Sequence, residues 1–290
     1  MARFCSKPDV TSVKCCDFDG VGYLVTCDPK EDPKIYVSIA LLCFEELAGY
    51  GAKEYAASHY KDMVVEPREG YDYTIAVDLT KLPESEEERK KLADSCGLLK
   101  RHLMAGAFQR AIDMFKRQEL GETLVLPYRD DEAMYLRPQD SSCAVVFSLR
   151  FDNEDDVAFA RVFMQEFADA RRDVSLRSAP AVTFKYGQKP LELDSVTIAQ
   201  EKGVGFITFA LFDRHVNTEE AANRSIDLVH QFRTYLHYHM KCSTAYLHSR
   251  MRKKYADFLQ ILNQAKPGAG EMRGPGTRTA TGRFMREART

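Results

Sequence analysis

The longest regular pattern of hydrophobic and polar positions lies near the end of the chain. Residues 218–266 contain no glycine or proline, and Pro267 follows them directly. From Val229 onward, apolar residues recur three or four positions apart, which is the period of one face of an α-helix. The pattern therefore predicts one uninterrupted helix over 218–266, which would be roughly 70 Å long.

This predicted helix is too long to lie wholly on its own domain. A compact chain of 290 residues has a diameter of only about 50 Å. We expect the helix to belong to the core as far as Met240 and to meet another subunit beyond it, because an apolar stripe left in water is an association site. The residues expected at the intersubunit surface are Met240, Leu247, Met251, Tyr255, Phe258 and Leu262.

The rest of the chain alternates strand-like and helical runs in an order that occurs twice. Three strands, a helix, two strands and a second helix are followed by the same series. Strands are expected at 10–16, 21–27, 35–39, 63–65, 71–79, 123–128, 133–137, 143–150, 181–186 and 204–212. Helices are expected at 41–58, 82–119, 152–173 and 218–266, the last with Asn217 as its N-cap.

The repeated order predicts an α+β protein with two similar domains, each an antiparallel sheet with helices on one side. The first domain would span 1–120. The second would span 121–266 and include the long helix. Residues 267–290 are rich in glycine, threonine and arginine, so a basic flexible tail is expected there.

Charge is distributed unevenly along a chain whose net charge is only −2. Residues 230–290 carry 12 lysines and arginines against three acids, which leaves them at +9 and residues 1–229 at −11. The basic cluster within the long helix consists of Arg250, Arg252, Lys253 and Lys254. A solvated basic face and a contact to an acidic polymer both fit this cluster. Binding of nucleic acid or of a membrane surface through it stays an alternative.

Composition argues against several other classes. No 18-residue apolar run could span a membrane, and the N-terminus has no apolar segment of a secretion signal. The eight cysteines are scattered without a CxxC pair, which is typical of reduced cysteines in the cytosol. The histidines lack the spacing of a helical zinc site and the acidic runs lack that of a calcium loop, so we expect no metal or cofactor.

One short motif points to an enzyme. The sequence DFDG at 17–20 resembles the DxDG motif of haloacid-dehalogenase-type phosphatases, in which Asp17 would be the nucleophile and Mg²⁺ ligand and Asp19 the general acid and base. That fold places a helix after the motif, whereas 21–25 reads as a strand. A hairpin turn is therefore the expected structure. A Mg²⁺-dependent phosphatase remains the alternative that a helix at 21–25 would revive.

A resemblance to a known family covers the chain from about residue 7 to its end. Residues 223–265 resemble the C-terminal helix of subunit 2 of the actin-related protein 2/3 complex. Further similar segments are DFDGV at 17–21, GYDY at 70–73, YRDDEAMY at 128–135, VFMQEF at 162–167, APAVTF at 179–184, GFITFALFDRH at 205–215 and TATGRF at 279–284.

The resemblance implies two domains of the secretion-chaperone-like fold and a structural role without catalysis, in the cytoplasm on the actin cytoskeleton. It implies that the long helix packs against subunit 4 and that the other subunits of the complex are partners. It also implies that the assembled complex grips the side of a mother actin filament and nucleates a branch there. The basic cluster is the expected actin contact, and no nucleic-acid partner is expected.

The sequence departs from the family at its start. Family members begin with an amphipathic helix before the first strand, whereas here the first expected strand begins at Val10. Either this lineage lost the helix or the chain start is truncated. In the second case a groove on the first sheet would be uncovered.

Overall fold

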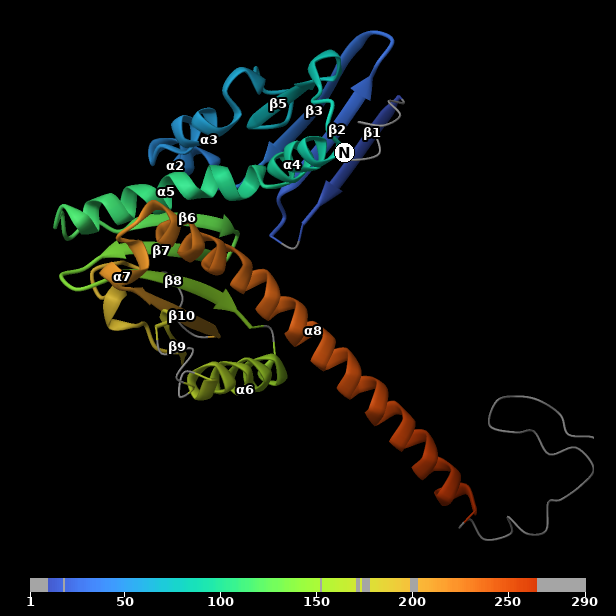
Figure 1. The fold of residues 1–290 in the computed structure, drawn as a ribbon. Coiled ribbons are helices and arrows are strands. Elements are labelled where there is room, and N and C mark those ends of the chain that lie inside the picture. The colour runs from blue at the N-terminus through green and yellow to red at the C-terminus, as the bar shows by residue number, and fades with distance from the viewer. Residues whose placement is uncertain are drawn as a thin grey trace, which may run out of the picture. The chain divides into compact units, whose positions relative to one another are not determined.

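The computed structural model describes residues 10–264 except 18, 152, 171–172, 174–177 and 199–202. The expected tail 267–290 and residues 1–9, which precede the first strand, lie outside the described residues. Contacts divide the chain into two units, 1–236 and 237–290. The first unit holds both sheets, and the second holds the distal part of the last helix (Figure 1).

The first half of the larger unit is built on a five-stranded antiparallel sheet with the strand order β1-β2-β3-β5-β4. Its strands are β1 Thr11–Cys16, β2 Gly22–Asp28, β3 Asp32–Ala40, β4 Val64–Val65 and β5 Tyr73–Asp78. Its helices are α2 Phe44–Gly49, α3 Ala52–Tyr60, α4 Glu86–Gly97 and α5 Leu99–Lys116, with short 3₁₀ turns at Lys61–Met63 and Leu79–Lys81.

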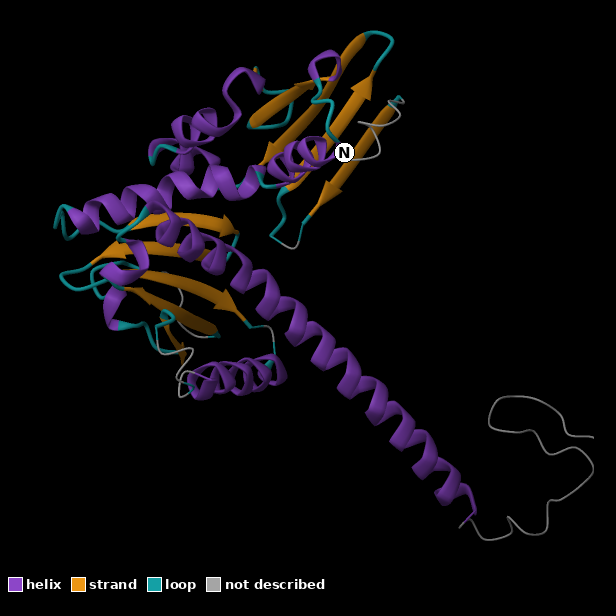
Figure 2. Ribbon diagram, in the orientation of Figure 1, coloured by secondary structure: helices purple, strands orange, loops and turns teal. Residues whose placement is uncertain are grey.

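The second half repeats this plan with the order β6-β7-β8-β10-β9, as labelled in Figure 1. Figure 2 shows the strands of both sheets in orange. Its strands are β6 Leu124–Arg129, β7 Glu132–Pro138, β8 Cys143–Arg150, β9 Ala181–Tyr186 and β10 Val204–Leu211. Its helices are α6 Glu154–Ala170, α7 Asp213–Val216 and α8 Glu219–Gln264, with a 3₁₀ turn at Leu191–Leu193. The identical strand order confirms the predicted α+β class with two similar antiparallel sheets.

Helix α5 is the central core element of the larger unit. Fourteen of its 18 residues are buried, which is the mark of a helix covered on nearly all sides. It contacts α3 from the first half and strands β7 and β8 from the second half. Gly106 permits the contact with α3, because a Cβ at that position would lie 2.6 Å from the Cα of Ala52.

Two predicted long helices are each divided in two, so those predictions were wrong in detail. The run 41–58 breaks at Gly51, whose φ of +91° belongs to the left-handed region that glycine adopts without strain. The run 82–119 breaks at Leu98, where φ is −89° and ψ is 12°, and its second helix ends at Lys116, before Gly121. The first of the two helices ends at Gly97, and glycine is the weakest helix former after proline, so the sequence did carry a local signal for this break.

The start of α8 also differs from the prediction. The hydroxyl oxygen of Thr218 accepts a hydrogen bond from the backbone N–H of Ala221 at 3.1 Å, so Thr218 is the N-cap. Asn217 instead closes the short helix α7, where its N–H donates to the carbonyl of Asp213 at 2.8 Å. The apolar pattern did not predict α7, which has only four residues.

Candidate protein-interaction surface

The proximal part of α8 is a core helix. Ile226, Val229, Phe232 and Leu236 are all buried. The ring of Phe232 meets that of Phe209 from β10 edge to face, with 4.8 Å between the centroids. Met240, at 5% exposure, is the last buried side chain of α8 among those that the structure describes.

Beyond Met240 the helix presents large apolar side chains to solvent. We define the distal stripe as Leu247, Met251 and Tyr255, which follow one another every four residues and are 45%, 64% and 63% exposed. Positions four apart lie on one face of a helix. The side chains of Phe258 and Leu262, which belong to the same predicted surface, lie outside the described residues.

The basic cluster lies beside the distal stripe in sequence, and all four of its side chains are exposed. The Arg250 guanidinium lies over the ring of Tyr246, 5.7 Å from its centroid, and donates to its hydroxyl at 3.4 Å. No carboxylate among the described residues pairs with any member of the cluster. All four positive charges of the cluster are therefore available to an external acidic surface.

The described residues of the DFDG segment, Asp17, Asp19 and Gly20, belong to the turn of a hairpin and not to an active site. Strand β2 follows it and pairs antiparallel with β1, so the helix that the phosphatase alternative required is absent. The Oδ1 atom of Asp17 accepts hydrogen bonds from the N–H groups of Asp19 at 2.8 Å and Val21 at 3.0 Å. Within the described part of the chain, no group of three or more metal-binding side chains could hold an ion. The phosphatase reading is therefore rejected.

The turn is held by a buried ion cluster that sequence reasoning missed. We call it the Lys100 clasp: the Nζ of Lys100 lies 2.7 Å from an oxygen of Asp17 and 2.5 Å from one of Asp19. The Lys100 side chain is only 11% exposed. A charge this deeply buried is tolerated because two carboxylates surround it.

The neighbouring residue Arg101 makes a second set of polar contacts from the same helix turn. Its Nε donates to a carboxylate oxygen of Asp227 at 2.7 Å, and one terminal nitrogen donates to the side-chain oxygen of Asn223 at 2.9 Å. Consecutive residues of α5 thus hold the first hairpin and the proximal part of α8. In the sequence, the sign of these contacts is the basic pair Lys100 and Arg101 near the start of an otherwise apolar run.

The buried His102 and the partly buried His230 flank this region. The Nδ1 of His102 lies 2.8 Å from the hydroxyl of Tyr60, and its ring stacks on that of His59 with 4.4 Å between centroids. Burial, followed by the nearby His59 and Arg101, lowers the pKa of His102 to about 4. Burial, followed by Lys100 and Arg101, lowers the pKa of His230 to about 4 as well. Both rings are therefore neutral at pH 7.

Acidification should destabilise the fold through these two histidines. Both folded-state pKa values lie below the unfolded value of about 6.5, so protons bind preferentially to the unfolded chain. The free energy of unfolding therefore keeps its full value above about pH 6.5, where both histidines are neutral in the folded and the unfolded chain. It falls as the pH drops from there toward 4. At pH 5 each histidine should lower the free energy of unfolding by about 2 kcal/mol. Urea unfolding at a series of pH values measures this loss.

The variant His230→Gln should remove about half of this histidine-dependent change between pH 7 and pH 5. His248, an exposed histidine of α8, supplies the matched control. His248→Gln should leave the pH dependence as it is. An unchanged pH profile for His230→Gln would contradict the assignment.

The fold and the surface together define a class: an α+β protein-interaction subunit that ends in a helix with an apolar stripe and a basic cluster. A family model described as "Arp2/3 complex, 34 kD subunit p34-Arc" matches residues 37–269. The chain belongs to this p34-Arc family. Family membership makes it a structural subunit and not an enzyme.

Two curated relatives are similar over most of their length. "Actin-related protein 2/3 complex subunit 2" of Schizosaccharomyces pombe is 39% identical over 292 aligned residues, which cover 93% of this chain and 90% of the relative. The protein of the same name from Dictyostelium discoideum is 36% identical, with coverage of 93% and 89%. In the part of the chain that the structure describes, no helix is long and apolar enough to cross a membrane.

Proposed function

We propose that the chain is a scaffold subunit of an actin-related protein 2/3 complex, located in the cytoplasm on the actin cytoskeleton. In this proposal the assembled complex binds the side of an actin filament and supports nucleation of a branch. The observation that carries it is the exposed distal stripe bordered by the basic cluster. The names of the two curated relatives support the assembly.

The distal stripe is the proposed contact with subunit 4. Burying an exposed side chain of this size contributes about 1.5 to 3 kcal/mol, so covering three of them would stabilise an interface substantially. Side chains repeated every four residues suit a partner helix that lies along the same face. Met240 is already buried within the chain and offers little of this surface.

The division into domains 1–120 and 121–266, with a tail at 267–290, forms part of the same proposal. The duplicated strand order supports two domains. Contacts nevertheless group residues 1–236 into one unit. The physical reason is that α5 packs on α3 of the first half and on β7 and β8 of the second.

The basic cluster is the proposed contact with the acidic surface of the actin filament. Replacing Arg250, Arg252 and Lys253 with glutamate reverses three charges of the cluster. This variant should lower the affinity of the assembled complex for filaments, measured by co-sedimentation, by about tenfold at low salt. Each exposed pair is worth up to about 1 kcal/mol and is screened as ionic strength rises. The complex itself should remain intact in gel filtration.

A matched control replaces three exposed lysines elsewhere with glutamate, namely Lys90, Lys91 and Lys116. That variant should sediment like the unmodified complex. Equal sedimentation of both triple variants would mean that the cluster is merely solvated or contacts a neighbouring subunit. Salt-sensitive binding to RNA or to anionic vesicles that exceeds binding to actin would overturn the proposal in favour of a nucleic-acid or membrane module.

A further inference from the structure

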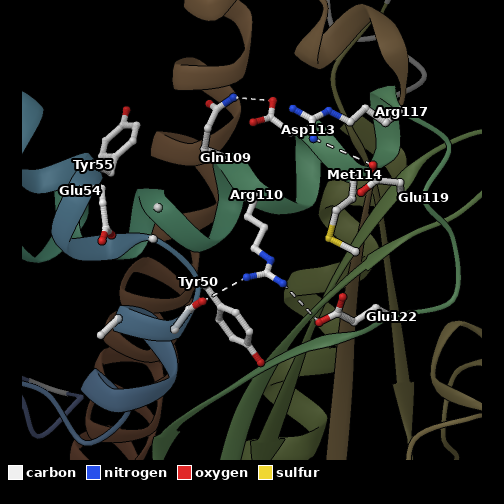
Figure 3. A pocket seen from close by; sticks show the side chains of 14 residues that line it. Tyr50, Glu54, Tyr55, Gln109, Arg110, Asp113, Met114, Arg117, Glu119 and Glu122 are labelled. Carbon is white, nitrogen blue, oxygen red and sulfur yellow. Dashed lines mark hydrogen bonds and ion pairs between the residues drawn. The ribbon is translucent and has the colours of Figure 1, made fainter.

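Two surfaces of the described chain are open enough to receive a partner: a groove of about 690 Å³ where α2, α3 and α5 meet, and the distal stripe. In the groove, the guanidinium of Arg110 is already engaged, since it donates to the carbonyl of Gly49 at 3.0 Å and lies 3.6 Å from a carboxylate oxygen of Glu122 (Figure 3). The other acidic side chains there lie on separate walls and do not converge. The groove therefore indicates no occupant, whereas the distal stripe carries a repeat that does.

The apolar residues of α8 recur every eleven residues. Two series of positions follow this repeat, and both lie within the one helix that runs from Glu219 to Gln264. A third position joins the repeat at Thr244 and holds Tyr255 eleven residues later. The first series is Val229, Met240, Met251 and Leu262, and the second is Leu236, Leu247 and Phe258.

The proximal members of both series are core residues. Val229, Leu236 and Met240 are all buried. One repeat further along the helix, Leu247 and Met251 are exposed. The repeat that places side chains in the core as far as Met240 therefore continues into the distal stripe, where an apolar face left in water is an association site.

A seven-residue repeat, as in an ordinary coiled coil, does not fit this segment. Counted in sevens from Leu247, the seam would pass through Lys254 and Ile261 and would leave Tyr255 at its edge. Burying the Lys254 ammonium in such a seam would cost free energy. Eleven residues make three turns at about 3.67 residues per turn, slightly more than in an ordinary α-helix, so a seam with this repeat winds with a slight right-handed twist.

The charges of this segment argue against a second copy of the chain as the partner. Residues 237–264 contain five lysines and arginines and a single acid, Asp257. Two copies paired along their stripes would place these cations close to one another, and like charges brought together at an interface are unfavourable. A helix of a different chain, with carboxylates beside its apolar residues, would instead meet opposite charges.

We propose that the distal stripe pairs with a single helix of another subunit through a seam with the eleven-residue repeat. The partner helix has apolar residues that follow the same repeat and acidic residues beside them. Tyr255 lies in the seam and its neighbour Lys254 lies at the edge, which is the reverse of the arrangement in a seven-residue seam. The inference rests on the proposed function, which supplies the partner subunit, and adds the geometry of the contact.

Cysteine accessibility in the purified, fully assembled complex tests the seam. Tyr255→Cys and Lys254→Cys are prepared as separate variants, and peptide mass spectrometry measures the rate at which a maleimide alkylates each introduced cysteine. Each rate is divided by that of the same variant unfolded in urea. Position 255 should then react at least about fivefold more slowly than position 254, because a thiol reacts only where the reagent reaches it. The native Cys242, which is exposed on the opposite side of the helix, is the control and should react at the same rate in both variants.

Photo-crosslinking in the same complex identifies the partner. p-Benzoylphenylalanine in place of Tyr255 keeps an aromatic side chain there and should link to one peptide of another subunit, with apolar residues three or four positions apart and acidic neighbours.

Two kinds of result would overturn the inference while the complex stays intact. A smaller difference in alkylation, or faster alkylation at position 255 than at 254, would refute the eleven-residue seam. No linked peptide, or one from a second copy of the chain, would refute the partner. Failure of the unmodified chain to assemble with any other subunit would instead refute the proposed function, so the failures are distinguishable in one preparation.

Discussion

Replacing Lys100 with methionine should lower the free energy of unfolding by about 3 kcal/mol. The Lys100 ammonium is nearly buried between Asp17 and Asp19, whose side chains are only 28% and 12% exposed. Without the cation, two neighbouring carboxylates repel each other and lose their compensating charge, which costs more than the pair contributes when intact. Urea unfolding of the full chain at pH 7.5 measures the loss.

Two further variants make this result specific. Lys90→Met removes an exposed lysine of α4 and should change the free energy of unfolding by less than about 0.5 kcal/mol. Adding Asp19→Asn to Lys100→Met should restore part of the lost stability, because one uncompensated charge is removed. A loss below about 1 kcal/mol for Lys100→Met would show that water already screens the cluster.

Aspartate at Leu247 and Met251 together should abolish assembly. The double change removes about 4 kcal/mol of apolar burial from the proposed interface and places two unpaired charges there. A loss of that size or more corresponds to at least a thousandfold weaker binding. A tagged double variant should then fail to recover the proposed partners, subunit 4 and the actin-related subunits, at modest salt, whereas the unmodified chain should recover them.

The control places aspartate on the opposite face of the same helix segment, at the exposed positions Cys242 and Ser249. This variant should recover the partners normally, since the two faces are about half a turn apart. Circular dichroism should show equal helix content in both double variants. Equal recovery of the partners by both would mean that the distal stripe is not the interface.

Local pattern predicted most elements because strands and helices bury one face at a characteristic period. The strands at 143–150 and 181–186 have the predicted bounds, and the alternating or β-branched runs of the first sheet shift by at most a few residues. The order of elements also predicted two similar antiparallel sheets. Their identical strand order was visible only once pairing was known, since register depends on contacts between distant segments.

The breaks within helical runs required the folded chain. The break at Leu98 follows Gly97, which weakens a helix locally but does not by itself end one, as glycines inside helices show. The close approach of Gly106 to Ala52 joins two helices that are far apart in sequence. The short helix α7 likewise depends on tertiary contacts, among them the hydrogen bond from the Ser225 hydroxyl to the carbonyl of His215 at 2.9 Å.

Some features of the candidate interaction surface were likewise predictable from the sequence, and others needed the structure. A single sequence suffices to predict a helix over 218–266, its apolar stripe and its basic cluster, because these follow from residue spacing along one continuous element. The burial of α8 as far as Met240 and the exposure beyond it needed the structure, since burial depends on what packs against a face. The Lys100 clasp arises only in the folded chain. It brings Lys100 to Asp17 and Asp19, which are 83 and 81 positions away in sequence, and no local period records such contacts.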